Sequence, residues 1–180
     1  MHKVIGIRGP NGAGKTTLAR ALMEKANYII QVTVAGSLVN VFDKFVVPGS
    51  YKRVCGGCDT LEYKNVHPTI LECALFSPVI YEGVLVGTTF EPTLKLNDEL
   101  SFQGSRLILV CLDVTLNEAI DNVNRRRAAE DKSAIGKTDN IEISYKKHLS
   151  SARKLHAAGV SIMWLPFNDA LTYIEEELGL

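Results

Sequence analysis

The chain has 180 residues, of which 46% are hydrophobic, and its 20 Lys and Arg balance 20 Asp and Glu to a formal net charge of zero. This length supports one well-buried core and is too short for two ordinary domains, so we expect residues 1–180 to form a single domain. The neutral balance excludes a global electrostatic field that would commit the protein to nucleic acid or membranes.

The start of the chain and its cysteines indicate a compartment. Met1-His2-Lys3 runs directly into a strand-like segment, with no signal peptide ahead of it. No apolar stretch reaches the roughly 18 residues of a membrane-spanning helix. The four cysteines fit a reducing compartment, where thiols stay free. We therefore expect a cytoplasmic protein with no membrane partner.

Short apolar runs rich in β-branched residues indicate buried strands. The first run, residues 4–7, is followed by a glycine-rich segment at 9–17 and by good helix formers at 18–25. Further runs of this kind lie at 79–81, 107–112 and 160–165. Because helical patterns separate the last two runs, we expect parallel strands covered by helices on both faces.

Helix signals are strongest in the second half of the chain. Thr115 and Glu118 have the spacing of a capping box, in which each side chain bonds the other residue's amide, and they predict a helix to about Lys132. A further helix is expected over residues 141–158, ended by Gly159 in a left-handed conformation.

Two other segments give weaker patterns. Residues 28–63 contain alternating apolar residues between glycines and prolines, which predict short strands or a hairpin. Near the end of the chain, Asn168 or Asp169 is expected to cap a short helix, with Gly179 after it.

The glycine-rich segment matches the phosphate-binding pattern G-x-x-x-x-G-K-[ST], and so predicts a P-loop. Glycines let backbone amides curl around phosphate oxygens, Lys15 reaches the β- and γ-phosphates, and Thr16 offers its hydroxyl to Mg²⁺. The helix that follows adds the positive end of its dipole. The residues expected to hold the nucleoside triphosphate are Gly9, Asn11, Gly12, Ala13, Gly14, Lys15, Thr16 and Thr17.

The sequence has no Asn-Lys-x-Asp guanine signature, which argues against a switch GTPase and favours ATP. Its size, its early P-loop and its later arginine-rich helix resemble the nucleoside and nucleotide kinase branch of P-loop proteins. This resemblance implies an α/β fold with three layers, a P-loop NTPase of the kinase-like kind with a central parallel sheet of about five strands. It also implies an adenine site near Phe167 and Asn168.

Glu82 ends the apolar run at 79–81 and is followed by Gly83. In open α/β sheets, ligands bind beyond the carboxyl ends of the strands. We expect Glu82 to face Mg²⁺ or its water shell, or to orient the phosphoryl acceptor. The alternative is a surface glutamate at a strand end.

Arg125, Arg126 and Arg127 fall late in the helix that begins after Thr115. Successive helical residues point about 100° apart, so all three cannot face one ligand. The resemblance to kinases implies a mobile lid at about residues 125–137 that brings arginines onto the transferring phosphoryl group, with Arg125 and Arg126 as catalytic candidates. The alternative is a favourable interaction with the helix dipole.

Cys55-Gly56-Gly57-Cys58-Asp59 is the most distinctive segment after the P-loop. A single Cys-x-x-Cys pair, without a second pair or suitably spaced histidines, does not complete a four-ligand zinc site. His148 and His156 are expected at the surface of their helix. A glycine pair followed by Asp59 fits a tight loop near the acceptor, with a carboxylate as general base. The alternative is a plain turn residue.

Two short motifs, Gly56-Gly57-Cys58-Asp59 and Glu82-Gly83-Val84-Leu85-Val86, resemble those of phage-encoded P-loop kinases that act on modified pyrimidines, in particular the 5-hydroxymethyluracil DNA kinases. The resemblance implies ATP-dependent phosphorylation of a hydroxymethyl group on a base in DNA, a step in thymidine hypermodification in the host cytoplasm. It implies Asp59 as the general base and Lys15 as a phosphate ligand.

A DNA-acting enzyme needs basic residues for phosphates and a face on which an extruded base can stack. Tyr51 or Tyr63 is the candidate for stacking, and either is equally plausible as core. The preferred basic set lies around the segment that contains Cys55 and Cys58, and a second set lies on the helix expected over residues 141–158. These two sets are Lys44, Lys52, Arg53 and Lys64, and Lys146, Lys147, Arg153 and Lys154.

Two alternatives stay open from the sequence. Within the kinases, the acceptor is a free nucleotide or nucleoside if the basic residues prove scattered. From another class, the chain is an ATP-binding regulatory module that hydrolyses ATP slowly and phosphorylates nothing. An acceptor pocket facing Asp59 and Glu82 argues against the second alternative.

Overall fold

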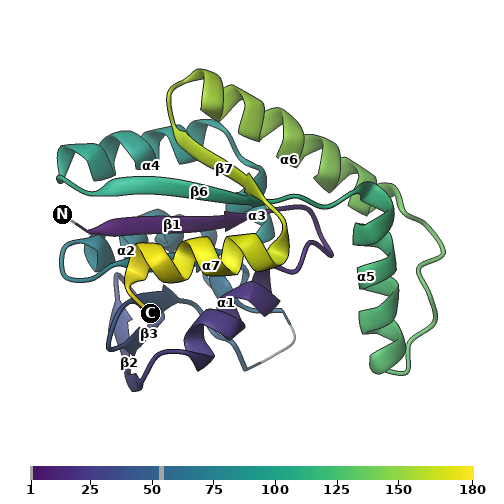
Figure 1. The fold of residues 1–180 in the computed structure, drawn as a ribbon, viewed down its shortest axis with the longest axis horizontal. Helices are drawn as coiled ribbons and strands as arrows, with labels where there is room; N and C mark the ends of the chain where they lie inside the picture. The colour runs from purple at the N-terminus through teal and green to yellow at the C-terminus, as the bar shows by residue number, and fades with distance from the viewer. Residues whose placement is uncertain (1, 53–54) are drawn as a thin grey trace.

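The computed structural model describes residues 2–52 and 55–180, and a seven-stranded sheet forms its centre (Figure 1). The strands lie in the order β2-β3-β4-β5-β1-β6-β7. Strands β4, β5, β1, β6 and β7 are parallel, and β2 and β3 form an antiparallel hairpin beside β4. The strands are β1 Lys3–Arg8, β2 Tyr28–Val34, β3 Ser37–Phe42, β4 Val46–Pro48, β5 Val79–Glu82, β6 Arg106–Leu112 and β7 Ser161–Leu165.

Helices cover both faces of this sheet. One core cluster joins α1 and α7 to the face that carries Ile5, Ile80 and Ile108, and the other joins α2, α4 and α6 to the face that carries Val4 and Tyr81. The helices are α1 Lys15–Glu24, the 3₁₀ helix η1 Gly57–Thr60, α2 Tyr63–Ala74, α3 Val84–Thr88, α4 Glu91–Phe102, α5 Leu116–Ala129, α6 Asp139–Ala157 and α7 Phe167–Leu178.

The predicted three-layer α/β fold is confirmed, but the expected number of about five strands is wrong. The sheet has seven strands because the segment 28–63, predicted as short strands or a hairpin, adds three strands, β2, β3 and β4, beside β5. The runs at 4–7, 79–81, 107–112 and 160–165 all form strands. Strands β6 and β7 are parallel, as the helices between them predict.

The helix ends test the capping predictions. Thr115 and Glu118 form the predicted capping box, although α5 ends at Ala129 and not near Lys132. Gly159 and Gly179 both adopt positive φ after their helices. Asn168 and Asp169 are not caps, because α7 begins one residue earlier than Asn168, after Pro166.

Helix α5 stands away from the sheet at one side of the molecule (Figure 1). Its apolar residues Ala119 and Val123 form a small cluster with Ile141 of α6, separate from the two main core clusters. The carboxyl ends of β1, β5 and β6 lie at the edge of the sheet from which α5 projects. The P-loop, Glu82 and α5 therefore meet there. None of the described helices is long and apolar enough to cross a membrane.

Candidate functional site

The P-loop connects the end of β1 to α1 and holds Lys15 close to its own backbone. The Lys15 ammonium donates hydrogen bonds to the carbonyl oxygens of Gly9 and Pro10, both at 3.0 Å. Lys15 is buried, and this burial lowers the pKa of its ammonium. The loop thus presents a positive charge inside a ring of backbone, which is the arrangement that binds phosphate.

Helix α5 supports the P-loop from the other side. The Asn122 side-chain amide donates to the Gly12 carbonyl oxygen at 2.9 Å. At Gly12, an added Cβ would lie 2.2 Å from the carbonyl oxygen of Ala119, so only glycine permits this contact. The position of α5 is therefore tied to the phosphate-binding loop itself.

Glu82 lies at the end of β5, where its carboxylate meets α1. The Thr16 hydroxyl donates to Glu82 Oε1 at 3.0 Å. Glu82 is almost fully buried, and burial raises the pKa of its carboxyl group to about 7, although nearby Lys15 opposes the rise. The structure thus places Glu82 in the site and excludes the alternative of a surface glutamate.

The same pair of residues has the chemistry of a Mg²⁺ site. Hydroxyl and carboxylate oxygens are the ligands that Mg²⁺ prefers, and a cation beside a buried carboxylate stabilises its charged form. Thr16 and Glu82 are the candidate ligands. Among the described residues no group of three or more His, Cys, Asp and Glu side chains forms a candidate metal cluster.

Asp59, in η1, lies at the amino end of α3. Both oxygens of its carboxylate accept from the Val84 amide at 2.9 Å, and Oδ1 also accepts from the Leu85 amide at 3.4 Å. Its loop approaches β5 closely: Gly57 has φ of +68°, and an added Cβ there would lie 2.5 Å from Glu82 Oε1. The Gly-Gly-Cys-Asp and Glu-Gly motifs therefore meet in space.

These groups surround one small cavity, the P-loop pocket, of about 110 Å³. Gly9 and Ala13 do not line it; the Gly9 carbonyl binds Lys15, and Ala13 is buried. The lining residues are Asn11, Gly12, Gly14, Lys15, Thr16, Thr17, Cys55, Asp59, Glu82, Val84 and Arg126. Most of the predicted site residues are thus brought together.

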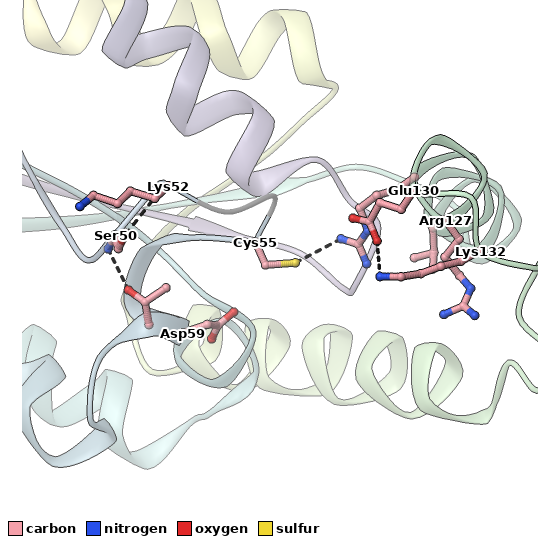
Figure 2. Close-up of a pocket in the computed structure, with 10 residues that line it drawn as sticks. Ser50, Lys52, Cys55, Asp59, Arg127, Glu130 and Lys132 are labelled. Atoms are coloured by element: carbon pink, nitrogen blue, oxygen red, sulfur yellow. Dashed lines mark hydrogen bonds and ion pairs between the residues drawn. The ribbon is translucent and has the colours of Figure 1, made fainter.

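A larger hollow of about 900 Å³, the open cavity, adjoins the P-loop pocket. Figure 2 shows Ser50, Lys52, Cys55 and Asp59 on one side of it and residues of the end of α5 on the other. Cys55, Asp59 and Arg126 line both spaces. Asp59 therefore faces the open cavity directly, whereas Glu82 lines only the P-loop pocket.

The three arginines of α5 have different surroundings. Arg126 lines both spaces, and its guanidinium lies 3.5 Å from Cys55 Sγ. Arg127 lines the open cavity and donates to the Ser133 carbonyl oxygen at 2.7 Å. Arg125 lines neither space and instead donates to Asn122 Oδ1 at 2.8 Å. The lid at 125–137 stays a prediction.

The expected stacking tyrosines do not line the open cavity. Tyr51 packs against the core on the α1 face, and its hydroxyl is buried without a described hydrogen-bond partner. Tyr63 is 50% exposed at the start of α2. Neither side chain therefore offers a face to a base in this cavity.

The preferred basic set is divided in the structure. Lys52 lines the open cavity, Lys64 forms an ion pair with Glu62 at 2.9 Å, and Lys44 lies in the turn between β3 and β4. Arg53 lies outside the described residues. Its three described members form no continuous track.

The surface position expected for His148 is wrong. Its side chain is 1% exposed, and its Nδ1 lies 3.4 Å from the Gly87 carbonyl oxygen. Burial lowers the pKa of its imidazole to about 4. His156, by contrast, is exposed, as expected.

Asn122 is a site residue that the sequence reasoning missed. Ala119, Asn122, Val123 and Arg126 follow the helical spacing i, i+3, i+4 and i+7, and so share one face of α5. Arg126 belongs to this face of α5, and Arg125 does not. The sequence spacing does not tell which face of α5 meets the P-loop, so the choice of Arg126 over Arg125 requires the structure.

Two known structures resemble the whole chain. A gluconokinase from Sinorhizobium meliloti 1021 matches with a TM-score of 0.54 and 12% identity, over 98% of this chain and 91% of the other. The tunicamycin resistance protein of Deinococcus radiodurans matches with a TM-score of 0.52 and 14% identity, over 100% of this chain and 97% of the other. At these identities the likeness shows the fold alone.

No family model matches the sequence. The chain is similar to a 5-hmdU DNA kinase of Pseudomonas phage PaMx11, with 32% identity over 173 residues, which cover 90% of this chain and 89% of the relative. It is also similar to a 5-hmdU DNA kinase of Delftia phage PhiW-14, with 26% identity over 170 residues, 87% of this chain and 65% of that relative. Because the identity with the first relative extends over most of both chains, this chain belongs to the 5-hmdU DNA kinase family, which its motifs resemble.

Proposed function

We propose that this enzyme transfers the γ-phosphoryl group of ATP to the 5-hydroxymethyl oxygen of 5-hydroxymethyluracil in DNA. Membership of the 5-hmdU DNA kinase family supports the acceptor. The observation that carries the mechanism is that Asp59 lines both the P-loop pocket and the open cavity. A carboxylate at this junction can serve an acceptor that enters from one side and a phosphate held on the other.

The P-loop supplies the nucleotide half of the site. Its amides and Lys15 bind the β- and γ-phosphates, where the ammonium replaces its present contacts with Gly9 and Pro10. The Phe167 ring lies next to the P-loop, since a Cβ added at Gly14 would be 3.5 Å from it. This position supports an adenine site beside the loop. The missing guanine signature supports ATP as the donor.

Thr16 and Glu82 would hold Mg²⁺. Bound there, the ion would supply positive charge that neutralises the negative charge developing on the phosphates. Burial keeps Glu82 in a low-dielectric position, where an ionised carboxylate and a cation attract each other strongly. The Thr16 hydroxyl fixes the orientation of Glu82.

The chemical step needs a base for the acceptor hydroxyl. The hydroxyl oxygen forms a bond to the γ-phosphorus, the bond from that phosphorus to the β,γ-bridging oxygen breaks, and ADP leaves with the electron pair. Asp59 takes the hydroxyl proton. The Val84 amide orients the Asp59 carboxylate toward the reaction, and Arg126 neutralises charge on the transferring group.

The size and lining of the open cavity support a nucleotide acceptor. About 900 Å³ lies within the range of ligand pockets and accommodates a base extruded from the helix. Lys52, Arg126 and Arg127 line it and can pair with a phosphate of the target nucleotide. The phage relatives support the host cytoplasm as the place where this enzyme meets DNA.

A transfer assay tests this function. The purified enzyme is given Mg²⁺ and γ-labelled ATP with DNA containing 5-hydroxymethyluracil, with unmodified DNA, or with free nucleosides and monophosphates. Label on the modified DNA alone is the expected result. Label only on a free nucleotide would make the enzyme a metabolic kinase. ATP hydrolysis without any labelled acceptor would indicate a regulatory module.

A further inference from the structure

A second hollow, the α6 groove, lies between α6 and the junction of α3 with α4. It measures about 600 Å³, and three lysines of α6 line it: Lys146, Lys147 and Lys154. No carboxylate is among its described lining residues. In a chain with a formal net charge of zero, this groove is a local concentration of positive charge.

These lysines are available to a ligand. All three are exposed, and none forms an ion pair within the described part of the chain. The Lys154 ammonium lies 5.9 Å from the centre of the Phe90 ring, which directs it toward the groove. A surface lysine whose partner is a carboxylate would instead have its charge already neutralised.

Their spacing suits a linear polyanion. Lys147, Ser150, Ser151 and Lys154 follow one stripe of α6 at helical spacing. Seven residues of helix rise by about 10 Å, which equals about three nucleotides of a duplex strand at 3.4 Å each. The Ser150 hydroxyl and the two ammonium groups on this stripe are typical phosphate contacts, whereas the buried Ser151 hydroxyl bonds Arg8 and the Thr89 carbonyl oxygen.

Helix α3 connects the α6 groove to the catalytic site. Val84, its first residue, lines the P-loop pocket and donates to Asp59. Leu85 and Thr88, on the same short helix, line the groove. The groove therefore has in its wall a residue, Leu85, whose amide contacts the carboxylate of the proposed base at 3.4 Å.

The two walls of the groove are fixed to each other by Arg8, at the end of β1. Its buried guanidinium donates to Ser151 Oγ of α6 at 2.8 Å, to Thr89 O at 3.3 Å and to Thr93 Oγ1 of α4 at 3.2 Å. His148 adds a contact from α6 to the Gly87 carbonyl oxygen of α3. The groove is therefore preformed and its position relative to the P-loop is set.

We infer that the α6 groove binds the sugar-phosphate backbone of the DNA strand that carries the target base. The strand that flanks the target lies along α6, while the target nucleotide, with its base and its own phosphate, is extruded past α3 into the open cavity. This inference rests on the proposed function, and it assigns the DNA track to the second basic set. Arg153 of that set does not line the groove.

The test removes the charges of the groove in a Lys146→Ala, Lys147→Ala, Lys154→Ala variant. DNA affinity is measured by fluorescence anisotropy with a labelled oligonucleotide over a range of salt concentrations. We expect affinity at low salt to fall about tenfold or more, and the slope of log affinity against log salt to decrease by about 2 to 3, since each phosphate contact contributes about one unit or less.

The matched control removes three lysines elsewhere, as Lys44→Ala, Lys64→Ala, Lys95→Ala, where Lys95 is an exposed residue of α4 that pairs with Glu99. This control is expected to keep the affinity and salt slope of the wild type. Thermal melting and ATP affinity check that each variant is folded. Wild-type affinity and slope in the groove variant would overturn the inference, as would a larger loss in the control.

The outcome is separable from that of the transfer assay. If the wild type phosphorylates modified DNA and the groove variant binds DNA normally, the proposed function stands and the groove assignment fails. If the wild type labels only free nucleotides, the proposed function fails, and anisotropy still decides the groove. A wild type that does not bind DNA would contradict both.

Discussion

The P-loop pocket and the open cavity meet at Asp59, yet they are built in different ways. The P-loop pocket, about 110 Å³, is formed mainly by one continuous loop, and its central charge, Lys15, is buried. The open cavity, about 900 Å³, is lined by side chains from the segment 50–60 and the end of α5. Phosphate recognition is thus local, whereas acceptor recognition depends on two distant segments.

This difference has a functional consequence. A triphosphate has the same shape in every donor, so a rigid loop of backbone amides binds it without adjustment. The acceptor side has the exposed residues and the room that a large substrate requires. Changes in the first region should therefore abolish chemistry, and changes in the second should affect one role at a time.

The largest effect is expected from Lys15→Ala, which removes the buried positive charge of the P-loop pocket. Removing the ammonium leaves the charge on the β- and γ-phosphates uncompensated, so kcat/KM should fall by roughly 10³-fold or more. Steady-state kinetics with Mg²⁺-ATP measures this loss. The control is Lys25→Ala, at the exposed end of the same helix, which should retain wild-type turnover. Near-normal turnover of Lys15→Ala would refute the P-loop assignment.

A pair of substitutions at Asp59 separates its two possible roles at the junction. Asn retains an oxygen that accepts from the Val84 amide but is not a base, and Ala lacks both properties. Asp59→Asn should keep the ATP affinity of the wild type, and its rate of phosphoryl transfer should fall by about 10²- to 10⁴-fold. The same loss of rate is expected for Asp59→Ala. If Asn is active and Ala is not, Asp59 only caps α3.

Substitutions at Arg126 and at its neighbour Arg125 compare an arginine that lines the open cavity with one that does not. Arg126→Ala should lower kcat by about 10²-fold because it removes a charge next to both pockets. Arg125→Ala should change kcat by no more than a few-fold, since that side chain bonds Asn122 outside the lining. Single-turnover measurements at saturating ATP give the comparison. Equal losses would mean that α5 moves during the reaction.

The last prediction concerns stability and not catalysis, through His148, which packs behind α3. Its folded pKa of about 4 lies below the ordinary value of 6.5, so the unfolded chain gains a proton first as pH falls. The free energy of unfolding should therefore be highest above pH 6.5 and should decrease by roughly 3 kcal/mol between pH 6.5 and 4 from this group.

Urea unfolding at several pH values measures the His148 effect. His148→Gln should flatten the pH dependence between pH 6.5 and 4, whereas His156→Gln, at an exposed position on the same helix, should leave it unchanged. An unchanged pH dependence in the His148 variant would contradict the burial of a neutral imidazole.

The two regions also differ in how far the sequence predicts them. The P-loop pattern, the strand that ends at Glu82 and the capping box of α5 depend on neighbouring residues, and all three are found as predicted. The choice between Arg125 and Arg126 depends on which face of α5 meets Gly12, a contact between residues 110 positions apart. Local patterns do not contain that information.

The predictions of a surface position for His148 and of about five strands are wrong for the same reason. His148 is polar and was placed on the surface, but Gly87 and the aromatic ring of Trp164, both from other elements, enclose it. The hairpin of β2 and β3 joins the central sheet only through β4, so its weak local pattern did not indicate a longer sheet. Tertiary packing decided both outcomes.

The most direct test of the account locates the transferred phosphate. An oligonucleotide with a single 5-hydroxymethyluracil and a blocked 5′ end is incubated with enzyme and γ-labelled ATP, then digested by a nuclease to mononucleotides without phosphatase. The account predicts label on the 5-hydroxymethyl oxygen with the wild type, and none with Asp59→Asn or with thymine at that position. Absence of label from the blocked oligonucleotide, with label on free nucleotides, would contradict it.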